Sequence, residues 1–500
     1  MSSVNQIRAP FGIFVILVSI LLSTLPRVAQ ARSMKKCNPC PVHREPEKAI
    51  HVLKDIYCDV ARHEPGEVHE TFQRMSRDAL SYFLGALPVF CWDLAALGRP
   101  WAHEPVGPKA LLLGDAHILN LGTVRDGQGA LIFDWIRLDQ AAPGPILVDV
   151  RRWLVSLILL ADEIATDVPD SEALLRDALR SYREGLSRFS GNSMTAEFAM
   201  SQENAAPFVR KMLRNASHRT RQQLLDRWTV TTSAGRRFRT QEEFLPVPPE
   251  LRESFEHALS GTQAPGRGPV FFHVKDATRR VYGSRRCQGH ERVYLLVEGL
   301  TEALEDDVIL EASMKPMSTL DHFLKGATPP SDGNALRVTD AAYLQRHFDE
   351  SRRVMNAAVL LRRSPEPFLR TIQLCGDTYL VEEVQPWETR LSTESLEGLA
   401  DLHDLARASG TLLARAHALT IRAPDQLVSF LTTWDRHPVP MENALVKFAL
   451  IYAAQTHVDF AAFRTHVAAK PLLVVPDRGR AAKGHRHRLH HHNGAESSAR

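Results

Sequence analysis

The residue types with the clearest capacity for chemistry lie at 113–122, a stretch that reads LGDAHILNLG. Asp115 and Asn120 have the D-x-x-x-x-N spacing of a phosphotransferase catalytic loop, in which the aspartate accepts the proton of the attacking hydroxyl and the asparagine binds magnesium. Asp134 follows Asn120 at the distance where such enzymes place the carboxylate that holds the metal of the nucleotide. Because Mg²⁺ prefers oxygen ligands, the pattern predicts a Mg²⁺–ATP site.

The same residues also have a purely structural interpretation. Asp115 would then cap a turn, while Asn120 satisfies backbone groups of the loop. His117 either orients the loop and reaches a substrate phosphate, as a further catalytic candidate, or is a hydrogen-bonded structural histidine. Asp149 is expected to anchor the loop or to cap the helix that begins there. A Ser-His-Asp hydrolase is not indicated, since the chain has no G-x-S-x-G motif.

Apolar periodicity predicts the elements that position these residues. Helices are expected at 67–93, 149–164, 171–189, 207–228 and 396–419, and strands at 110–113, 130–133, 293–297, 308–311, 371–374 and 378–384. The last two strands form a hairpin around Gly376. A segment rich in Pro and Gly at 246–269 is typical of a linker. We therefore expect an α+β fold with a small antiparallel sheet and a larger helical part.

Several motifs follow one another along the chain. They are RM at 74–75, YFLG at 82–85, GDAHILNLG at 114–122, FDWIRLDQ at 133–140, RVYG at 280–283, KPMS at 315–318, LVEEVQP at 380–386 and LARAHA at 413–418. In this order they resemble the bacterial domain-of-unknown-function 2252 family, over about residues 74–420, and the GDAH-x-x-N block is the most specific part. The resemblance implies a two-lobed fold like that of protein kinases or aminoglycoside phosphotransferases, with no assigned substrate.

The resemblance also implies where the nucleotide phosphates bind. Gly283 and Gly289 are the candidates for a glycine-rich loop, and Lys315 is the candidate for the phosphate-binding lysine. These residues come after the catalytic loop, whereas kinases have them before it, so a circular permutation is expected. The alternative for Lys315 is a surface charge beside a strand.

The chain departs from the family pattern near the expected site. Leu84 stands where an arginine is expected, and Arg137 stands where the family has an acidic residue. Asp134 and Asp139 therefore remain as carboxylate candidates for the metal, together with Asn120. A cation at 137 weakens metal binding unless it points away or pairs with phosphate. These departures favour a reduced or lost activity.

Residues 1–31 are typical of an export signal. Arg8 precedes an apolar run at 11–25, and Ala29 and Ala31 give the small-x-small pattern of a cleavage site. Cleavage after Ala31 predicts an exported, periplasmic protein that contacts the membrane only through this leader. Two alternatives are an uncleaved membrane anchor and translation from Met34, which predicts a cytoplasmic protein.

The domain organisation follows from these assignments. A linker containing cysteines at 32–66 precedes a kinase-like domain at 67–470, and a basic, His-rich tail expected to be disordered follows at 471–500. The domain divides into a catalytic-loop part at 67–245, a β-rich part at 270–390 and C-terminal helices at 391–470. Cys37 and Cys40 are expected to form a disulfide in an oxidising compartment.

The net charge of +3, from 61 Lys+Arg and 58 Asp+Glu, is too balanced to indicate a nucleic-acid partner. Much of the positive charge belongs to the leader and the tail, so the body of the chain is mildly acidic.

Two functions are consistent with the sequence. The first is a kinase-like phosphotransferase that uses Mg²⁺ and ATP to phosphorylate the hydroxyl of a small molecule or a protein. The second is a non-catalytic, pseudokinase-like envelope protein that keeps the fold for binding or as a scaffold, because an exported protein meets little nucleotide. The sequence indicates neither the substrate nor the oligomeric state.

Overall fold

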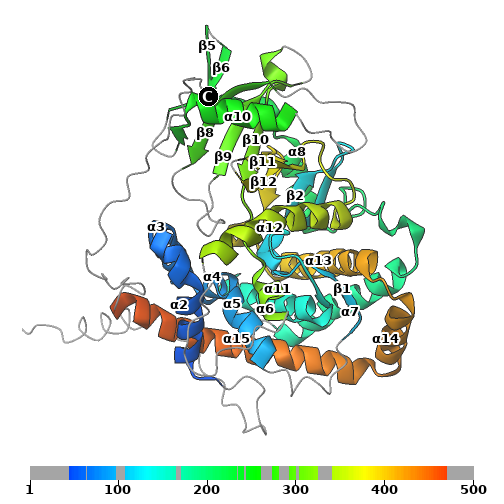
Figure 1. Ribbon diagram of the computed structural model, residues 1–500. Coiled ribbons are helices and arrows are strands. Elements are labelled where there is room, and N and C mark those ends of the chain that lie inside the picture. Colours follow the sequence, from blue (N-terminus) through cyan, green and yellow to red (C-terminus); the bar gives the residue numbers. More distant parts are fainter. Residues whose placement is uncertain are drawn as a thin grey trace, which may run out of the picture. The chain divides into compact units, whose positions relative to one another are not determined.

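The computed structural model describes residues 44–63, 65–96, 107–164, 170–233, 235–240, 244–260, 273–280, 292–299, 303–324, 340–374 and 376–469. These residues form helices and antiparallel sheets, which confirms the predicted α+β class (Figure 1). The predicted leader, the residues Cys37, Cys40, Gly283 and Gly289, and the predicted tail lie outside the described residues.

The first described part is helical. It consists of α2 (Pro46–His63), α3 (Pro65–Met75), α4 (Ala79–Gly85) and α5 (Leu87–Ala96). The helical pattern predicted at 67–93 is confirmed over most of its length, but it is divided because the chain turns at residues 76–78. Asp78 has an extended backbone there, and its carboxylate accepts a hydrogen bond from Ser81 N at 2.5 Å. This N-cap starts a new helix, since it satisfies an amide that has no partner within the helix.

Two short antiparallel sheets carry the predicted catalytic loop. In the first, β1 (Lys109–Leu112) pairs with β4 (Ala142–Pro145). In the second, β2 (Leu121–Arg125) lies between β3 (Leu131–Trp135) and β13 (Thr389–Arg390), with Gly122 opposite Asp134. The loop between β1 and β2 ends in the short 3₁₀ helix η1 (Ile118–Asn120). The hairpin therefore holds Asp134 beside the end of this loop.

Three long helices pack behind the loop. They are α6 (Leu147–Ile164), α7 (Ser171–Phe189) and α13 (Leu399–Thr420), and α7 and α13 run side by side (Figure 1). Their close approach requires glycine, since a Cβ at Gly185 would lie only 2.7 Å from the Cβ of Ala414. The α6 helix is buried over most of its length, and Trp153 donates a hydrogen bond to Ser409 Oγ at 2.9 Å. This core gives the loop a rigid support.

Among the described residues, the larger sheet consists of strands in the order β11-β12-β10-β9-β8-β7. Their bounds are β7 (Phe244–Pro246), β8 (Val274–Arg280), β9 (Arg292–Val297), β10 (Val308–Ser313), β11 (Arg370–Leu374) and β12 (Asp377–Glu383). The helix α10 (Pro249–Ser260) lies across the sheet (Figure 1), so the prediction of a linker at 246–269 was wrong for the described residues 246–260. The helix forms because Phe255 and Leu259 bury their side chains in the core of the sheet.

The remaining elements connect these parts. The expected helix at 207–228 is divided into α8 (Pro207–Ser217) and α9 (Arg221–Trp228) by a capping box at Thr220. The others are η2 (Ser193–Thr195), β5 (Thr229–Thr232), β6 (Gly235–Phe238), η3 (Leu304–Asp306), α11 (Thr319–Leu324), α12 (Asp340–Leu361), η4 (Thr393–Ser395), α14 (Pro424–Arg436) and α15 (Pro438–Ala469). The α12 helix packs against β12. Within the described ranges, no helix has both the length and the hydropathy needed to cross a membrane.

Candidate functional site

Asp149 anchors the loop at 113–120 through hydrogen bonds to its backbone, which is one of the two roles that the sequence predicted. The two carboxylate oxygens of Asp149 accept hydrogen bonds from Leu113 N at 2.6 Å and Gly114 N at 3.1 Å. His417 Nε2 lies 3.3 Å from the same carboxylate, and His417 Nδ1 lies 2.7 Å from the hydroxyl of Tyr182. All these groups are buried. The backbone that leads into Asp115 is thus fixed by a buried network rather than by its own sequence.

Asp115 forms a nearly buried ion pair with Arg152. Its Oδ1 accepts a hydrogen bond from Arg152 Nε at 2.6 Å, and the Arg152 side chain is only 1% exposed while that of Asp115 is 22% exposed. Burial alone raises the pKa of this carboxyl, but Arg152 and His117 outweigh it and lower the pKa below its usual range. Asp115 is consequently a stable anion and a weak proton acceptor.

His117 lies on the other side of the same carboxylate. Its Nε2 is 3.5 Å from Asp115 Oδ2, and its Nδ1 is buried with no hydrogen-bond partner among the described residues. Burial lowers the pKa of His117, although Asp115 opposes this shift. The imidazole is therefore neutral at pH 7, and it orients the carboxylate more readily than it delivers a proton.

Asn120 holds the loop closed with its side chain. Its Nδ2 donates a hydrogen bond to the carbonyl oxygen of Asp115 at 2.7 Å, and the same oxygen accepts the His117 amide at 2.8 Å. This is the structural role that the sequence left open as an alternative to metal binding. The NH2 group of Asn120 is used within the loop, so only Asn120 Oδ1 could accept a hydrogen bond or bind a metal.

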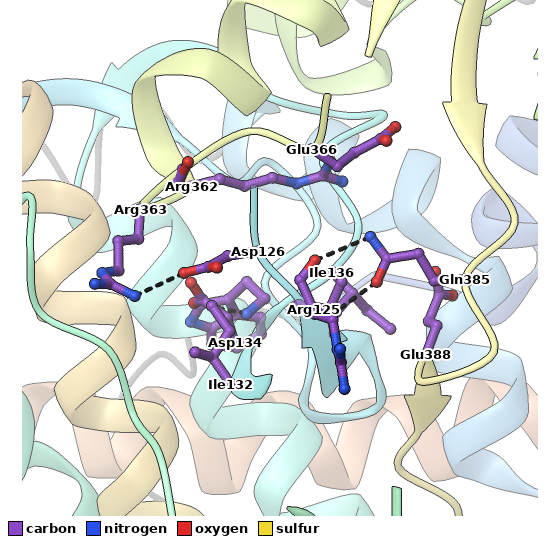
Figure 2. A pocket seen from close by; sticks show the side chains of 13 residues that line it. Arg125, Asp126, Ile132, Asp134, Ile136, Arg362, Arg363, Glu366, Gln385 and Glu388 are labelled. Atoms are coloured by element: carbon purple, nitrogen blue, oxygen red, sulfur yellow. Dashed lines mark hydrogen bonds and ion pairs between the residues drawn. The ribbon is translucent and has the colours of Figure 1, made fainter. Parts of the chain in front are cut away.

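Asp134 faces a different cavity from Asp115. This cavity has a volume of about 30 Å³, and Arg362, Glu366 and Asp126 are among its lining residues (Figure 2). Asp134 Oδ1 accepts a hydrogen bond from Trp135 N at 2.8 Å, and Oδ2 lies 3.6 Å from the buried Arg415. Burial raises the pKa of Asp134, and Arg415 opposes this shift.

Asp139 and Lys315 meet at the point where the loop region contacts the large sheet. Lys315 Nζ lies 3.6 Å from Asp139 Oδ1 and 3.2 Å from Glu382 Oε2. Asp139 also pairs with Arg137. Lys315 is only 5% exposed, so the structure excludes the alternative of a surface charge. Burial opposes ionisation of Glu382, but Lys315 and Arg362 together lower its pKa.

A second cavity of about 470 Å³ brings together four of the predicted site residues. Asp115, His117, Asn120 and Asp139 all line it, whereas Asp134 lines the small cavity. The three predicted metal ligands, Asn120, Asp134 and Asp139, therefore do not line one common cavity. In the part of the chain that the structure describes, no group of three or more His, Cys, Asp or Glu residues is arranged to hold a metal ion.

The predicted carboxylates fit Mg²⁺ poorly because protein cations already neutralise their charges. Each predicted carboxylate already has a protein cation beside it: Arg152 for Asp115, Arg415 for Asp134, and Arg137 with Lys315 for Asp139. A divalent cation would have to displace these partners and would be repelled by the displaced charges.

Sequence reasoning missed the cations that neutralise the site. Arg415 belongs to a motif of the family resemblance, but no local pattern assigns a partner to Arg415 or to Arg152. Arg415 donates hydrogen bonds to Thr195 O and Leu361 O, and Arg152 packs over the ring of Phe83 at 4.5 Å. A buried arginine in an apolar helix was the available signal, since such a charge requires a partner.

Residues 63–466 match the model of a protein family described as an uncharacterised protein conserved in bacteria (DUF2252). The match covers most of the chain, and the chain therefore belongs to this family. No curated protein and no solved structure matches it significantly.

Proposed function

We propose that this member of an uncharacterised bacterial family is a non-catalytic ligand-binding protein built on the framework of a kinase-like phosphotransferase. The observation that carries the proposal is the pairing of every predicted metal-ligand carboxylate with a protein cation. Arg137 is the clearest case, because it stands where the family resemblance places an acidic residue and it pairs with Asp139. A cation here takes the place of the charge that a magnesium ion would supply.

The state of Asp115 supports the same proposal. A general base works best when its pKa lies near the operating pH, whereas Arg152 lowers the pKa of Asp115 below its usual range. Export, as expected from residues 1–31, adds a second argument, since a periplasmic protein meets little ATP.

A phosphotransferase remains the second candidate, and one observation favours it. The hairpin register places Asp134 opposite Gly122, directly after the loop that holds Asp115 and Asn120.

Magnesium-dependent ATP binding separates the two candidates. We expect no Mg²⁺-dependent shift in the melting temperature of the purified wild-type protein with ATP, and no transfer of radiolabelled γ-phosphate. Arg137→Asp restores the acidic residue and should bind Mn²⁺ more tightly than wild type, measured by electron paramagnetic resonance. Far-UV circular dichroism checks that this variant is folded.

Mg²⁺-dependent binding of ATP would contradict the proposed function. If wild-type protein binds ATP in a Mg²⁺-dependent way and Asp134→Ala or Asp139→Asn abolishes this binding, the proposed non-catalytic function is wrong and the phosphotransferase is supported.

A further inference from the structure

Arginines from four separate segments line the cavity of about 470 Å³ beside Asp115. Arg74 lies in the last turn of α3, and Arg77 lies in the turn before α4. Arg137 follows β3, and Arg390 is the second residue of β13. These segments are far apart in the sequence, so the fold alone brings their positive charges to one cavity.

The carboxylates that face this cavity do not cancel that charge. Asp115 is neutralised by Arg152, and Asp139 is contacted by Lys315, both of which are nearly fully buried. Arg152 therefore offsets the charge of Asp115. Asp139 also pairs with Arg137, so the excess positive charge of the cavity comes from Arg74, Arg77 and Arg390.

Arg74 and Arg390 form ion pairs with partly exposed glutamates. Arg74 lies 3.8 Å from Glu70 and also donates a hydrogen bond to Thr71 Oγ1 at 2.8 Å. Arg390 lies 3.1 Å from Glu388, and both glutamate side chains are more than a third exposed. Exposed ion pairs of this kind contribute little. Arg77 has an exposed side chain and forms no ion pair with any described residue.

We propose that this cavity binds a small organic anion, a carboxylate or a phosphate ester, through Arg74, Arg77 and Arg390. The inference rests on the proposed binding function and names the ligand class for it. The planar guanidinium group suits both anions, because it donates two parallel hydrogen bonds to a pair of oxygens. The volume lies within the range of about 300–1,000 Å³ that is usual for small-molecule sites.

Isothermal titration calorimetry with simple probes tests this inference. Glycerol 3-phosphate, glycerate and glycerol share one carbon skeleton and differ in their anionic group. In buffer without Mg²⁺ or nucleotide, we expect one or both anions to bind and glycerol not to bind. The anion that binds more tightly shows whether the preferred anionic group is a phosphate or a carboxylate.

Variants assign the binding to this cavity. Arg77→Gln should weaken the binding of the anion by about tenfold or more, since a hydrogen bond to a charged group is lost. Arg219→Gln is the matched control, because Arg219 is also exposed, has no ion pair among the described residues and lies outside the cavity lining. This control should bind like wild type.

The inference is overturned if neither anion binds, if glycerol binds as well as the anions, or if Arg77→Gln and Arg219→Gln bind equally. Its failure is distinct from failure of the proposed function. Mg²⁺-dependent ATP binding together with anion binding that needs Arg77 would refute the non-catalytic function and leave the anion site standing.

Discussion

The ion pair between Arg152 and Asp115 allows a quantitative test of how the buried charges of the site stabilise one another. Removing one partner of a buried ion pair leaves an uncompensated charge and costs about 3–5 kcal/mol. Arg152→Met removes the charge and keeps an apolar side chain over the ring of Phe83, where the guanidinium now lies 4.5 Å from the centroid. We therefore expect Arg152→Met to lower the free energy of unfolding by about 3–5 kcal/mol at pH 7.

A second change tests whether the loss comes from the charge left on Asp115. The double variant Arg152→Met with Asp115→Asn has no unpaired charge at this site. Its free energy of unfolding should therefore fall by less than the sum of the decreases in the two single variants. The difference should exceed about 1 kcal/mol, since residues in direct contact show coupling of about 0.5–3 kcal/mol.

The pH dependence has opposite signs in the two proteins. In wild type the pKa of Asp115 is lowered, so the stabilisation by the pair is present above about pH 4 and is lost as the pH falls through the lowered pKa. In Arg152→Met, burial raises the pKa of Asp115 instead. The variant should therefore gain stability as the pH falls from 7 to 5, whereas this pair gives wild type no such gain.

Urea unfolding followed by tryptophan fluorescence at pH 5 and pH 7 measures these effects. Arg183→Met is the control, because its pair with Asp435 is exposed and should contribute at most about 1 kcal/mol. Strict additivity of the Arg152 and Asp115 changes, together with parallel pH profiles, would refute the reasoning.

Two further predictions concern buried charges outside the loop. Burial, reinforced by neighbouring Glu383, raises the pKa of Glu366 to about 8, so wild-type stability should fall between about pH 5 and pH 8 by up to about 1.4 kcal/mol per pH unit. Glu366→Gln should flatten this profile in urea unfolding, and an unchanged slope contradicts the prediction. Arg44 lies 2.7 Å from Asp93 and 2.6 Å from Asp459, and Arg44→Ala should cost about 3–5 kcal/mol in the same assay. A loss below about 1 kcal/mol would show that the two acids find other partners.

Local patterns were sufficient for much of the fold. The helix expected at 171–189 has the bounds predicted for it, because an N-cap at Asp170 and an amphipathic stripe are both encoded within the segment. The anchoring role expected for Asp149 was also confirmed, although its contacts to Leu113 and Gly114 join distant parts of the chain. The differences from prediction at 67–93 and 246–260 arose where a cap divided a continuous apolar pattern and where the burial of Phe255 outweighed a Pro- and Gly-rich composition.

The candidate site was less accessible to sequence reasoning. The residues Asp115, His117, Asn120 and Asp139 were expected near one another, and they line one cavity. The sequence did not indicate that Asp134 lines another cavity. The reason is that side-chain direction depends on how the hairpin packs against Arg415 and the segment after α12.

The sequence by itself determined which residue types are present, where the loop and its strands lie, and that Arg137 brings a positive charge into an acidic motif. Only the tertiary structure established that Arg152, Arg415 and Lys315 neutralise the carboxylates and that arginines from four segments line one cavity. Periodicity and caps act over a few residues and can be recognised locally. Ion pairing depends on which distant segments pack together, and the hydrophobic core controls that packing.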